Sequence, residues 1–290
     1  MKKGLVMEGG GMRGMFTCGV IDVLMEKGIT FDGAGGISAG AVFGCNFKSH
    51  QIGRPIRYNK NYCKDKRYKS IRSLVMTGDL YGVDFCYREL PDELDPFDRK
   101  AFRENPMAFY VGATDVNTGC IVYHQCTDGG ETDMQWMRAS ASMPLVSRVV
   151  EVGGRQLLDG GVVEPTPYFY MKEMGYDRNV VILTQPREYR KEQSAAMPLI
   201  AMAMRKYPKL VEAMKKRYSS YNAHIAAIRE EEKAGVCLVI CPPSPLPVHR
   251  TESDPEKLDQ AYRIGRTEAQ KQLETIYNFL KEDGNVKANL

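Results

Sequence analysis

The sequence predicts an α/β protein whose central sheet is mainly parallel and covered by helices on both faces. Two observations lead to this class. Short apolar runs alternate along the chain with longer stretches of helical periodicity, and strands separated by helices pair in parallel. The 290 residues are 43% hydrophobic and 26% charged, so the chain can bury a core on each side of such a sheet.

The N-terminal segment predicts a strand, a helix, a second strand and a second helix. Leu5–Met7 is a short apolar run that ends in glycines, and residues 12–27 carry apolar side chains with the spacing of one helix face. Gly28 is placed to end that helix, and the apolar, glycine-rich residues 29–37 lead to Ser38, where a new helical stretch begins. Glycine-rich turns therefore join each of the first two strands to a helix.

The middle of the chain predicts short helices and two hairpins. Residues 54–105 are rich in basic, aromatic and acidic side chains and predict short helices and loops. Apolar or β-branched runs at 108–113 and 120–124 flank an Asn-Thr-Gly turn, and those at 149–152 and 156–158 flank a Gly-Gly turn. Each pair predicts an antiparallel hairpin.

The C-terminal part predicts two buried strands, 180–184 and 236–241, on either side of a polar-rich helical region. Residues 255–282 close the chain with a predicted helix. We therefore expect an N-terminal domain of residues 1–185 and a mostly helical extension, residues 186–290, that packs on the same core.

The composition argues against several classes of protein. The formal net charge is only +4, so the overall field predicts no nucleic-acid partner. The eight cysteines form no Cys-x-x-Cys pair and have no histidines at zinc-ligand spacing, so we expect reduced thiols and no metal site. No apolar stretch has the length of a signal peptide or a membrane-spanning helix, and we expect a cytoplasmic protein.

The sharpest chemical signal is the pentapeptide Gly36-Ile37-Ser38-Ala39-Gly40 at the second strand-to-helix junction. A serine in a Gly-x-Ser-x-Gly turn is lifted clear of the chain, and the flanking glycines leave space for the neighbouring strand and helix. The N-terminus of the following helix favours negative charge near the serine. A plain small-residue turn has the same pattern. Ser38 is our candidate nucleophile, with Gly36 and Gly40 as the glycines of a nucleophile elbow.

A glycine-rich loop follows the first strand and comprises Gly9, Gly10, Gly11, Met12, Arg13 and Gly14. Backbone amides at the start of a helix point towards one spot and can hold an oxyanion or a phosphate. The spacing also fits the dinucleotide-binding pattern Gly-x-Gly-x-x-Gly, and Asp32 lies near the position of a ribose-binding carboxylate. Ser38 favours the oxyanion hole, because the elbow follows within one β-α unit and a dinucleotide fold has no use for it. The Arg13 side chain either braces the loop or faces a phosphate.

The candidate base is Asp159, which leaves the last strand of the second predicted hairpin into two glycines. Asp-Gly is also common turn chemistry, so a simple turn is the structural alternative. None of the four histidines has a recognisable sequence context. The chain order Ser, Asp, His would still permit a triad through His224 or His249, so a dyad and a triad both stay open.

Together these motifs resemble those of the patatin-like phospholipases. That family has a Gly-Gly-Gly-x-[Lys/Arg]-Gly loop near its start, a Gly-x-Ser-x-Gly elbow soon after and an Asp-Gly-[Gly/Ala] motif, and all three occur here in order. The segment 139–144, Ala-Ser-Ala-Ser-Met-Pro, is similar to the small-residue and proline stretch ahead of the family's aspartate strand. The resemblance covers residues 4–185. Glu8, where many members have Asp or Gly, is a departure that lies before the loop.

The resemblance implies a three-layer α/β/α patatin-like fold and cleavage of acyl esters in phospholipids or lysophospholipids, without a metal or an organic cofactor. It implies a dyad in which Ser38 attacks the ester carbonyl and Asp159 takes its proton. The amides around Gly10, Gly11 and Met12 would hold the oxyanion, and water would release the acyl group. Two other classes stay open: a nucleotide-binding protein or oxidoreductase that uses the glycine loop, and a patatin-fold protein with a regulatory binding role.

Residues 187–217 are basic and rich in methionine, a composition that suits contact with anionic lipid headgroups or an adaptable lid. A core-packed helix with a solvated basic face has the same composition. We therefore expect a lipid or acyl-ester substrate, and contact with the inner face of the membrane through this stretch is one of two interpretations.

Overall fold

The strands of this protein form one mixed sheet. The computed structural model describes residues 1–281, and within them eight strands pair in the order β5-β6-β3-β2-β1-β7-β8, with β4 paired to β3. The strands are β1 (Lys2–Met7), β2 (Gly33–Ile37), β3 (Ala108–Asp115), β4 (Ile121–Cys126), β5 (Val150–Val152), β6 (Arg155–Asp159), β7 (Tyr176–Ile182) and β8 (Cys237–Ile240). The run from β3 through β2, β1 and β7 to β8 is parallel, whereas β4, β5 and β6 pair antiparallel. The centre of the sheet is therefore parallel, as predicted, and one side is antiparallel.

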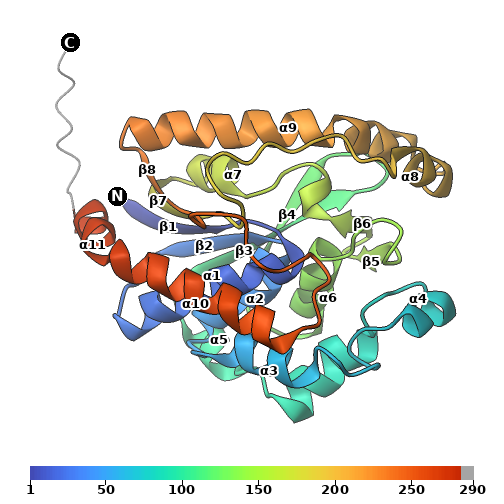
Figure 1. Cartoon of the computed structure of the whole chain (residues 1–290), viewed down its shortest axis with the longest axis horizontal. Helices are drawn as coiled ribbons and strands as arrows, with labels where there is room; N and C mark the ends of the chain where they lie inside the picture. The colour runs from blue at the N-terminus through green and yellow to red at the C-terminus, as the bar shows by residue number, and fades with distance from the viewer. Residues whose placement is uncertain (282–290) are drawn as a thin grey trace.

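Helices cover both faces of the sheet (Figure 1). On one face, α7 (Tyr168–Glu173) and the long α9 (Pro208–Lys233) bury apolar side chains against β1, β7 and β8. The other face is covered by α1 (Gly14–Glu26), α2 (Ala39–Lys48), α6 (Glu131–Ser140) and α10 (Pro255–Lys271). The predicted three-layer α/β/α fold is confirmed.

The first half of the chain has the predicted order of elements. The segment β1-α1-β2-α2 is the expected strand-helix-strand-helix unit, and β3–β4 and β5–β6 are the two expected hairpins. Glycine makes both hairpin turns possible. Gly119 has a φ of +68°, and Gly153 and Gly154 have φ values of +58° and +71°, which other residues adopt only with strain.

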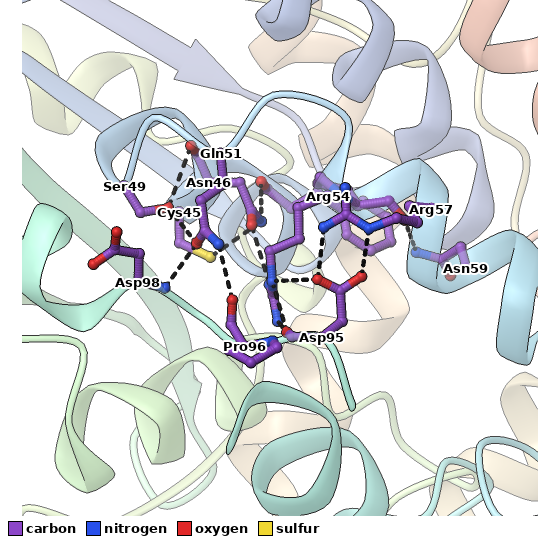
Figure 2. Close-up of polar contacts among 12 residues, drawn as sticks. Cys45, Asn46, Ser49, Gln51, Arg54, Arg57, Asn59, Asp95, Pro96 and Asp98 are labelled. Carbon is purple, nitrogen blue, oxygen red and sulfur yellow. Dashed lines mark hydrogen bonds and ion pairs between the residues drawn. The ribbon is translucent and has the colours of Figure 1, made fainter. Parts of the chain in front are cut away.

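The segment 54–105 is held against α2 by a buried network around Asp95 (Figure 2). Its elements are α3 (Arg54–Tyr62), α4 (Ile71–Thr77), a π-helical stretch (Phe85–Leu94) and α5 (Arg99–Glu104). The Asp95 carboxylate accepts two hydrogen bonds from Arg57, at 2.8 and 2.7 Å, and its backbone carbonyl accepts two from Arg54, at 3.0 and 2.6 Å. Arg54 also donates to Asn46 Oδ1 of α2 at 3.1 Å. These bonds fix α3 and the chain that follows the π-helical stretch to α2.

The C-terminal part extends the same sheet and covers α1. After α8 (Met197–Ala203) and α9, β8 pairs with β7, and α10 then packs on α1. Gly19 and Gly265 allow this close contact, because a Cβ on either would lie 2.0 Å from a carbonyl of the other helix. The predicted closing helix is divided at Gln272 into α10 and α11 (Leu273–Lys281), and its last predicted residue, Glu282, lies outside the described residues.

Candidate active site

Ser38 occupies a strained turn between β2 and α2. Its φ is +54° and its ψ −120°, outside the regions that non-glycine residues favour. Close packing requires the flanking glycines: a Cβ on Gly36 would lie 2.3 Å from Gly40 O, and one on Gly40 would lie 2.4 Å from Met7 O. The Ser140 hydroxyl accepts from Ser38 N at 2.8 Å and donates to a β3 carbonyl at 2.6 Å. The turn therefore has the backbone strain and the close glycine packing of the predicted elbow.

Asp159 accepts a hydrogen bond from the Ser38 hydroxyl, with Oγ 2.6 Å from Oδ2. Strand β3 lies between β2 and β6 and brings Ser38 and Asp159 close together. Ile37 at the end of β2 pairs with a β3 residue whose neighbour, Ala113, lies opposite Asp159. The other carboxylate oxygen, Oδ1, accepts from Gly161 N at 2.7 Å. The carboxylate is thus fixed by its own turn while its second oxygen faces the serine.

Burial raises the pKa of the Asp159 carboxyl above its usual range, because the residue is only 1% exposed. The hydrogen bond from Ser38, the positive charge of Arg217 and the Gly161 amide act in the opposite direction and offset burial only in part. Arg217 lies close by, since its Nε donates to Gly161 O at 2.6 Å. A carboxylate with a raised pKa is a stronger proton acceptor, as a general base needs to be.

All four histidines are among the described residues, and none lines the cavity at Ser38. His224 is partly buried beside Phe169 and shares a 2.8 Å hydrogen bond with Thr166 Oγ1; desolvation lowers its pKa to about 4. His249 is exposed. The serine hydroxyl donates directly to the aspartate, so no imidazole stands between them. This geometry favours the dyad over a triad through either histidine.

The glycine loop keeps two amides without a protein partner. In the described part of the chain, Gly10 N and Gly11 N donate to no acceptor. Met12 N donates to Arg250 O at 3.0 Å and so, contrary to the prediction, is not available to an oxyanion. Gly11 has a φ of +58°, and a Cβ there would lie 2.5 Å from the same Arg250 oxygen. The candidate oxyanion donors are therefore Gly10 and Gly11.

The remaining predicted loop residues have packing roles in this geometry. Gly9 N donates to Pro165 O at 3.1 Å, and a Cβ on Gly14 would lie 2.7 Å from the Phe43 ring. Arg13 reaches the cavity, and its Nε is buried without a hydrogen-bond partner among the described residues. A buried, unpaired guanidinium nitrogen fits an anion-facing role better than a bracing one.

Glu8, the departure from the family pattern, ties the loop to the chain after β7. It is 1% exposed, and its Oε2 accepts from both the amide and the hydroxyl of Thr184. Its Oε1 accepts from the Tyr221 hydroxyl of α9 at 2.7 Å. Gly10 packs on the same threonine, since a Cβ would lie 2.6 Å from Thr184 Oγ1. Glu8 is therefore a structural residue of the loop.

A cavity of about 420 Å³ contains Ser38 and Asp159. Much of its lining is apolar and includes Tyr68, Leu80, Tyr81, Leu90, Leu145 and Val146. Five cations also line it, namely Arg13, Arg138, Lys191, Arg217 and Arg250. A largely apolar pocket with a few polar groups at one centre is the usual form of a small-molecule binding site.

A second cluster, His124, Cys126 and Asp133, has three potential metal ligands within 4.8 Å of one another. Asp133 Oδ1 is 2.8 Å from His124 Nε2, and its Oδ2 accepts from three backbone amides between 2.8 and 3.0 Å. Burial raises the pKa of Cys126 well above its usual range. The hydrogen bonds of Asp133 join His124 on β4 to the backbone amides after β4, so this cluster stabilises the loop that follows the strand.

The geometry argues against the dinucleotide interpretation. The glycine loop follows the C-terminal end of β1, and a ribose-binding carboxylate has to lie at the same edge of the sheet. Asp32 precedes β2, which runs parallel to β1, and it accepts from Lys3 N near the start of β1 at 2.7 Å. Asp32 therefore lies at the opposite edge from the glycine loop.

Residues 5–171 match the family described as patatin-like phospholipase. This chain belongs to that family. The matched segment runs from β1 into α7 and contains the glycine loop, Ser38 and Asp159. Residues 207–281, which hold α9, β8, α10 and α11, match a different family, described as a domain of unknown function (DUF6363).

Several curated proteins resemble this patatin-like chain. An uncharacterized NTE family protein of Mycobacterium tuberculosis is 26% identical over 178 residues, covering 61% of this chain and 48% of that protein. Lysophospholipase nte1 of Aspergillus niger is 28% identical over 185 residues, 60% of this chain and 11% of that protein. The uncharacterized protein YjjU of Escherichia coli is 27% identical and covers 99% of this chain and 81% of that protein. The chain spans about half the length of the mycobacterial relative.

Among solved structures, human GIVD cytosolic phospholipase A2 in complex with methyl gamma-linolenyl fluorophosphonate aligns with a TM-score of 0.51. The identity is 11%, and the alignment covers 97% of this chain and 58% of that chain. This likeness shows a shared fold. None of the helices within residues 1–281 combines the length and the apolar character that crossing a bilayer requires.

The basic stretch 187–217 is divided between core and surface. Met197, Ile200, Leu210 and Met214 are buried in a cluster with residues of β6 and the following turn. On α8, Leu199 and Met202 are 52% and 61% exposed, and the basic residues 205, 206 and 209 are exposed beyond them. Two cations of the stretch, Lys191 and Arg217, lie at the cavity.

Sequence patterns did not indicate Arg250 or Tyr221, because no motif surrounds either residue. Ser140 stood out only as part of a small-residue segment, with no signal for its bond to the elbow. Lys191 and Arg217 stood out only as part of a basic stretch with two interpretations, a contact with lipid headgroups or a solvated helix face. What links all five to the site is contact across the fold, which local spacing does not encode.

Proposed function

We propose that this chain is a serine hydrolase that cleaves acyl ester bonds of lipids, with Ser38 as nucleophile and Asp159 as general base. The proposal rests on the 2.6 Å hydrogen bond from Ser38 Oγ to a buried carboxylate whose other oxygen is held by Gly161 N. A serine that donates directly to a carboxylate of raised pKa can lose its proton as it attacks a carbonyl carbon. Membership of the patatin-like phospholipase family supports lipid acyl esters as the substrate class.

In the proposed reaction, Ser38 Oγ attacks the ester carbonyl carbon while its proton passes to Asp159 Oδ2. The carbonyl oxygen gains negative charge, and the amides of Gly10 and Gly11 stabilise it. The ester C–O bond then breaks, and Asp159 returns the proton to the departing alcohol. A water molecule gives a proton to Asp159 and attacks the acyl-serine, which releases the carboxylic acid and restores the Ser38 hydroxyl.

We infer a phospholipid or lysophospholipid as substrate. The apolar lining of the cavity suits an acyl chain, and a volume of about 420 Å³ suits one chain better than two. A relative that matches 60% of this chain is named a lysophospholipase. Both observations support a single-chain acyl ester.

We further propose a division of labour between residues 1–185, a patatin-like catalytic domain, and the extension 186–290, whose residues 282–290 lie outside the described part. The first domain holds Ser38 and Asp159, and the extension adds three of the cations that line the cavity. The exposed Leu199 and Met202, with the basic residues that follow α8, support peripheral contact with an anionic membrane. Unchanged sedimentation with anionic vesicles after charge reversal at 205, 206 and 209 would contradict that contact.

An activity-based probe tests the catalytic proposal. A fluorophosphonate should label the wild-type protein, and Ser38→Ala should abolish labelling. Ser219→Ala, an exposed serine on α9, is the matched control and should label normally.

Persistent labelling of Ser38→Ala would contradict the assignment of the nucleophile. Absence of labelling in the wild type, together with a thermal shift induced by a nicotinamide or flavin nucleotide, would favour the nucleotide-binding alternative. A panel of single-chain and two-chain acyl esters, with Ser38→Ala as control, tests the substrate class. Failure of the wild type to hydrolyse any of them would overturn the proposed function.

A further inference from the structure

Four cations around the cavity have no carboxylate partner. Among residues 1–281, Arg13, Lys191, Arg217 and Arg250 take part in no ion pair within 4.0 Å. Several arginines elsewhere in the chain do pair with carboxylates. Figure 2 shows one of these pairs, in which Arg57 donates two hydrogen bonds to the carboxylate of Asp95. Within the described residues, four cations without an ion pair therefore gather at this one cavity.

The carboxylates that line the same cavity are already engaged. Glu8 accepts from Thr184 and Tyr221, and Asp159 accepts from Ser38 and from the turn that follows it. Asp79 is the third carboxylate at the cavity. It pairs with Arg138, whose nitrogen lies 3.7 Å from a carboxylate oxygen of Asp79. The four cations thus leave uncompensated positive charge in a partly enclosed space.

The fold holds three of these cations beside the reactive centre. Arg217 Nε donates to Gly161 O, and the amide of the same glycine donates to the Asp159 carboxylate. Arg250 is anchored by its carbonyl on Met12 N of the glycine loop. Lys191 is fixed at its backbone by two bonds to Asn222, and its ammonium lies 4.2 Å from the centre of the Tyr221 ring. All three come from the extension beyond the segment that matches the patatin-like family.

This arrangement is unfavourable without an anion. Burial, together with the charges of Arg217 and Arg250, lowers the pKa of Lys191 to about 7. Burial also lowers the pKa of Arg13, whose Nε has no acceptor. A bound anion would supply the missing acceptors and remove the repulsion between the cations.

We propose that Lys191, Arg217 and Arg250 form a subsite for the phosphate of an anionic acyl-ester substrate. This inference rests on the proposed function, since it places the phosphate beside the ester that Ser38 attacks. The apolar lining takes the acyl chain, and guanidinium groups suit the oxygens of a phosphate. A phosphate that carries no cationic headgroup fits best, because a choline or ethanolamine would add positive charge next to three cations.

Paired substrates test the subsite. A monoacylglycerol phosphate and the neutral monoacylglycerol with the same acyl chain differ only in the phosphate. Lys191→Gln and Arg250→Gln should each lower kcat/KM for the phosphate ester at least about 10-fold, mainly through KM, because a charge-assisted hydrogen bond is lost. Hydrolysis of the neutral ester should change little. Lys215→Gln changes an exposed lysine on α9 and is the matched control; it should alter the hydrolysis of neither substrate.

Binding to Ser38→Ala separates this inference from the proposed function, because it requires no turnover. Monoacylglycerol phosphate should bind more tightly than monoacylglycerol by calorimetry, and Lys191→Gln in the same background should remove the difference. Inorganic phosphate serves as the third ligand: binding as tight as that of the lipid would assign the subsite to free phosphate and overturn the lipid assignment. Equal binding of the charged and neutral lipids would overturn the subsite, even if the wild type hydrolyses both.

Discussion

The chain contains two Asp-Gly-Gly turns, residues 128–130 and 159–161, that share one local bond and differ in their surroundings. In each turn the aspartate Oδ1 accepts from the amide of the second glycine, at 2.8 Å in the first and 2.7 Å in the second. Asp128 is exposed, whereas Asp159 is buried and its other oxygen accepts from Ser38. The tripeptide produces the turn, and the neighbouring strands produce the candidate site.

The two turns also differ in how the buried carboxylate at each one is hydrogen-bonded, and therefore in its pKa. At the first turn, the buried carboxylate is Asp133, which accepts from the backbone amides of residues 127–129 and bonds to His124. Burial alone would raise the pKa of Asp133, but these hydrogen bonds outweigh it and lower the pKa. The pKa of Asp159, with fewer donors, is raised. A carboxylate saturated with donors stabilises a loop, and one left short of donors can accept a proton.

The largest expected effect is on hydrolysis, and it comes from comparing the same substitution at the aspartate of each turn. Asp159→Asn should lower kcat/KM for a lipid ester by at least about 10³-fold, because the amide cannot take the serine proton. The Asn oxygen can still accept from Gly161 N, so the fold should persist. Asp128→Asn should leave hydrolysis unchanged, and steady-state kinetics with circular dichroism on both variants makes the comparison. Comparable activity in Asp159→Asn and wild type would refute the dyad.

A smaller effect is expected from Asp133→Asn, and it should fall on stability. Loss of the charge that binds three amides should lower the free energy of unfolding by about 2 kcal/mol at neutral pH. Because the folded pKa of Asp133 is lowered, its contribution is present above the ordinary pKa and disappears as pH falls through the folded value. Urea denaturation at several pH values measures this. Lost hydrolysis in a folded variant would show that the first turn is also part of a reactive site.

The smallest effect is a difference in pH dependence between the two aspartates. The folded pKa of Asp159 is raised, so its contribution to stability is full below the unfolded pKa and is lost as pH rises through the folded value. The melting temperature of Asp159→Asn relative to wild type should therefore increase with pH, opposite to the trend for Asp133→Asn. Wild-type kcat/KM should fall on the acid side at a pH above about 4, the ordinary aspartate value. An acid limb at or below that value would contradict a raised pKa.

Local patterns carried much of the prediction. The glycine loop, the elbow at Ser38 and the turn at Asp159 each depend on a few consecutive residues, because positive φ angles and close backbone contacts require glycine at set positions. The alternation of strands and helices predicted the parallel centre of the sheet. Those features follow from short-range sterics, which the sequence expresses directly.

Contacts between distant segments could not be predicted in the same way. Met12 N was expected to face an oxyanion, and no pattern near residue 12 reveals that Arg250 O accepts from it. The triad alternative was open for the same reason, since chain order does not tell how far His224 or His249 lies from Ser38. Each of these points depends on how the chain after β7 packs over the elements that precede it.

The bond from Met12 N to Arg250 O joins the start of the chain to one of its last loops. During synthesis, the glycine loop leaves the ribosome long before residue 250 does. Until then Met12 N has no acceptor, and nothing holds the loop from that side. On the proposed function, a nascent chain therefore lacks a finished oxyanion hole, and its lipid-cleaving activity begins only after residue 250 has been made and has folded onto the loop.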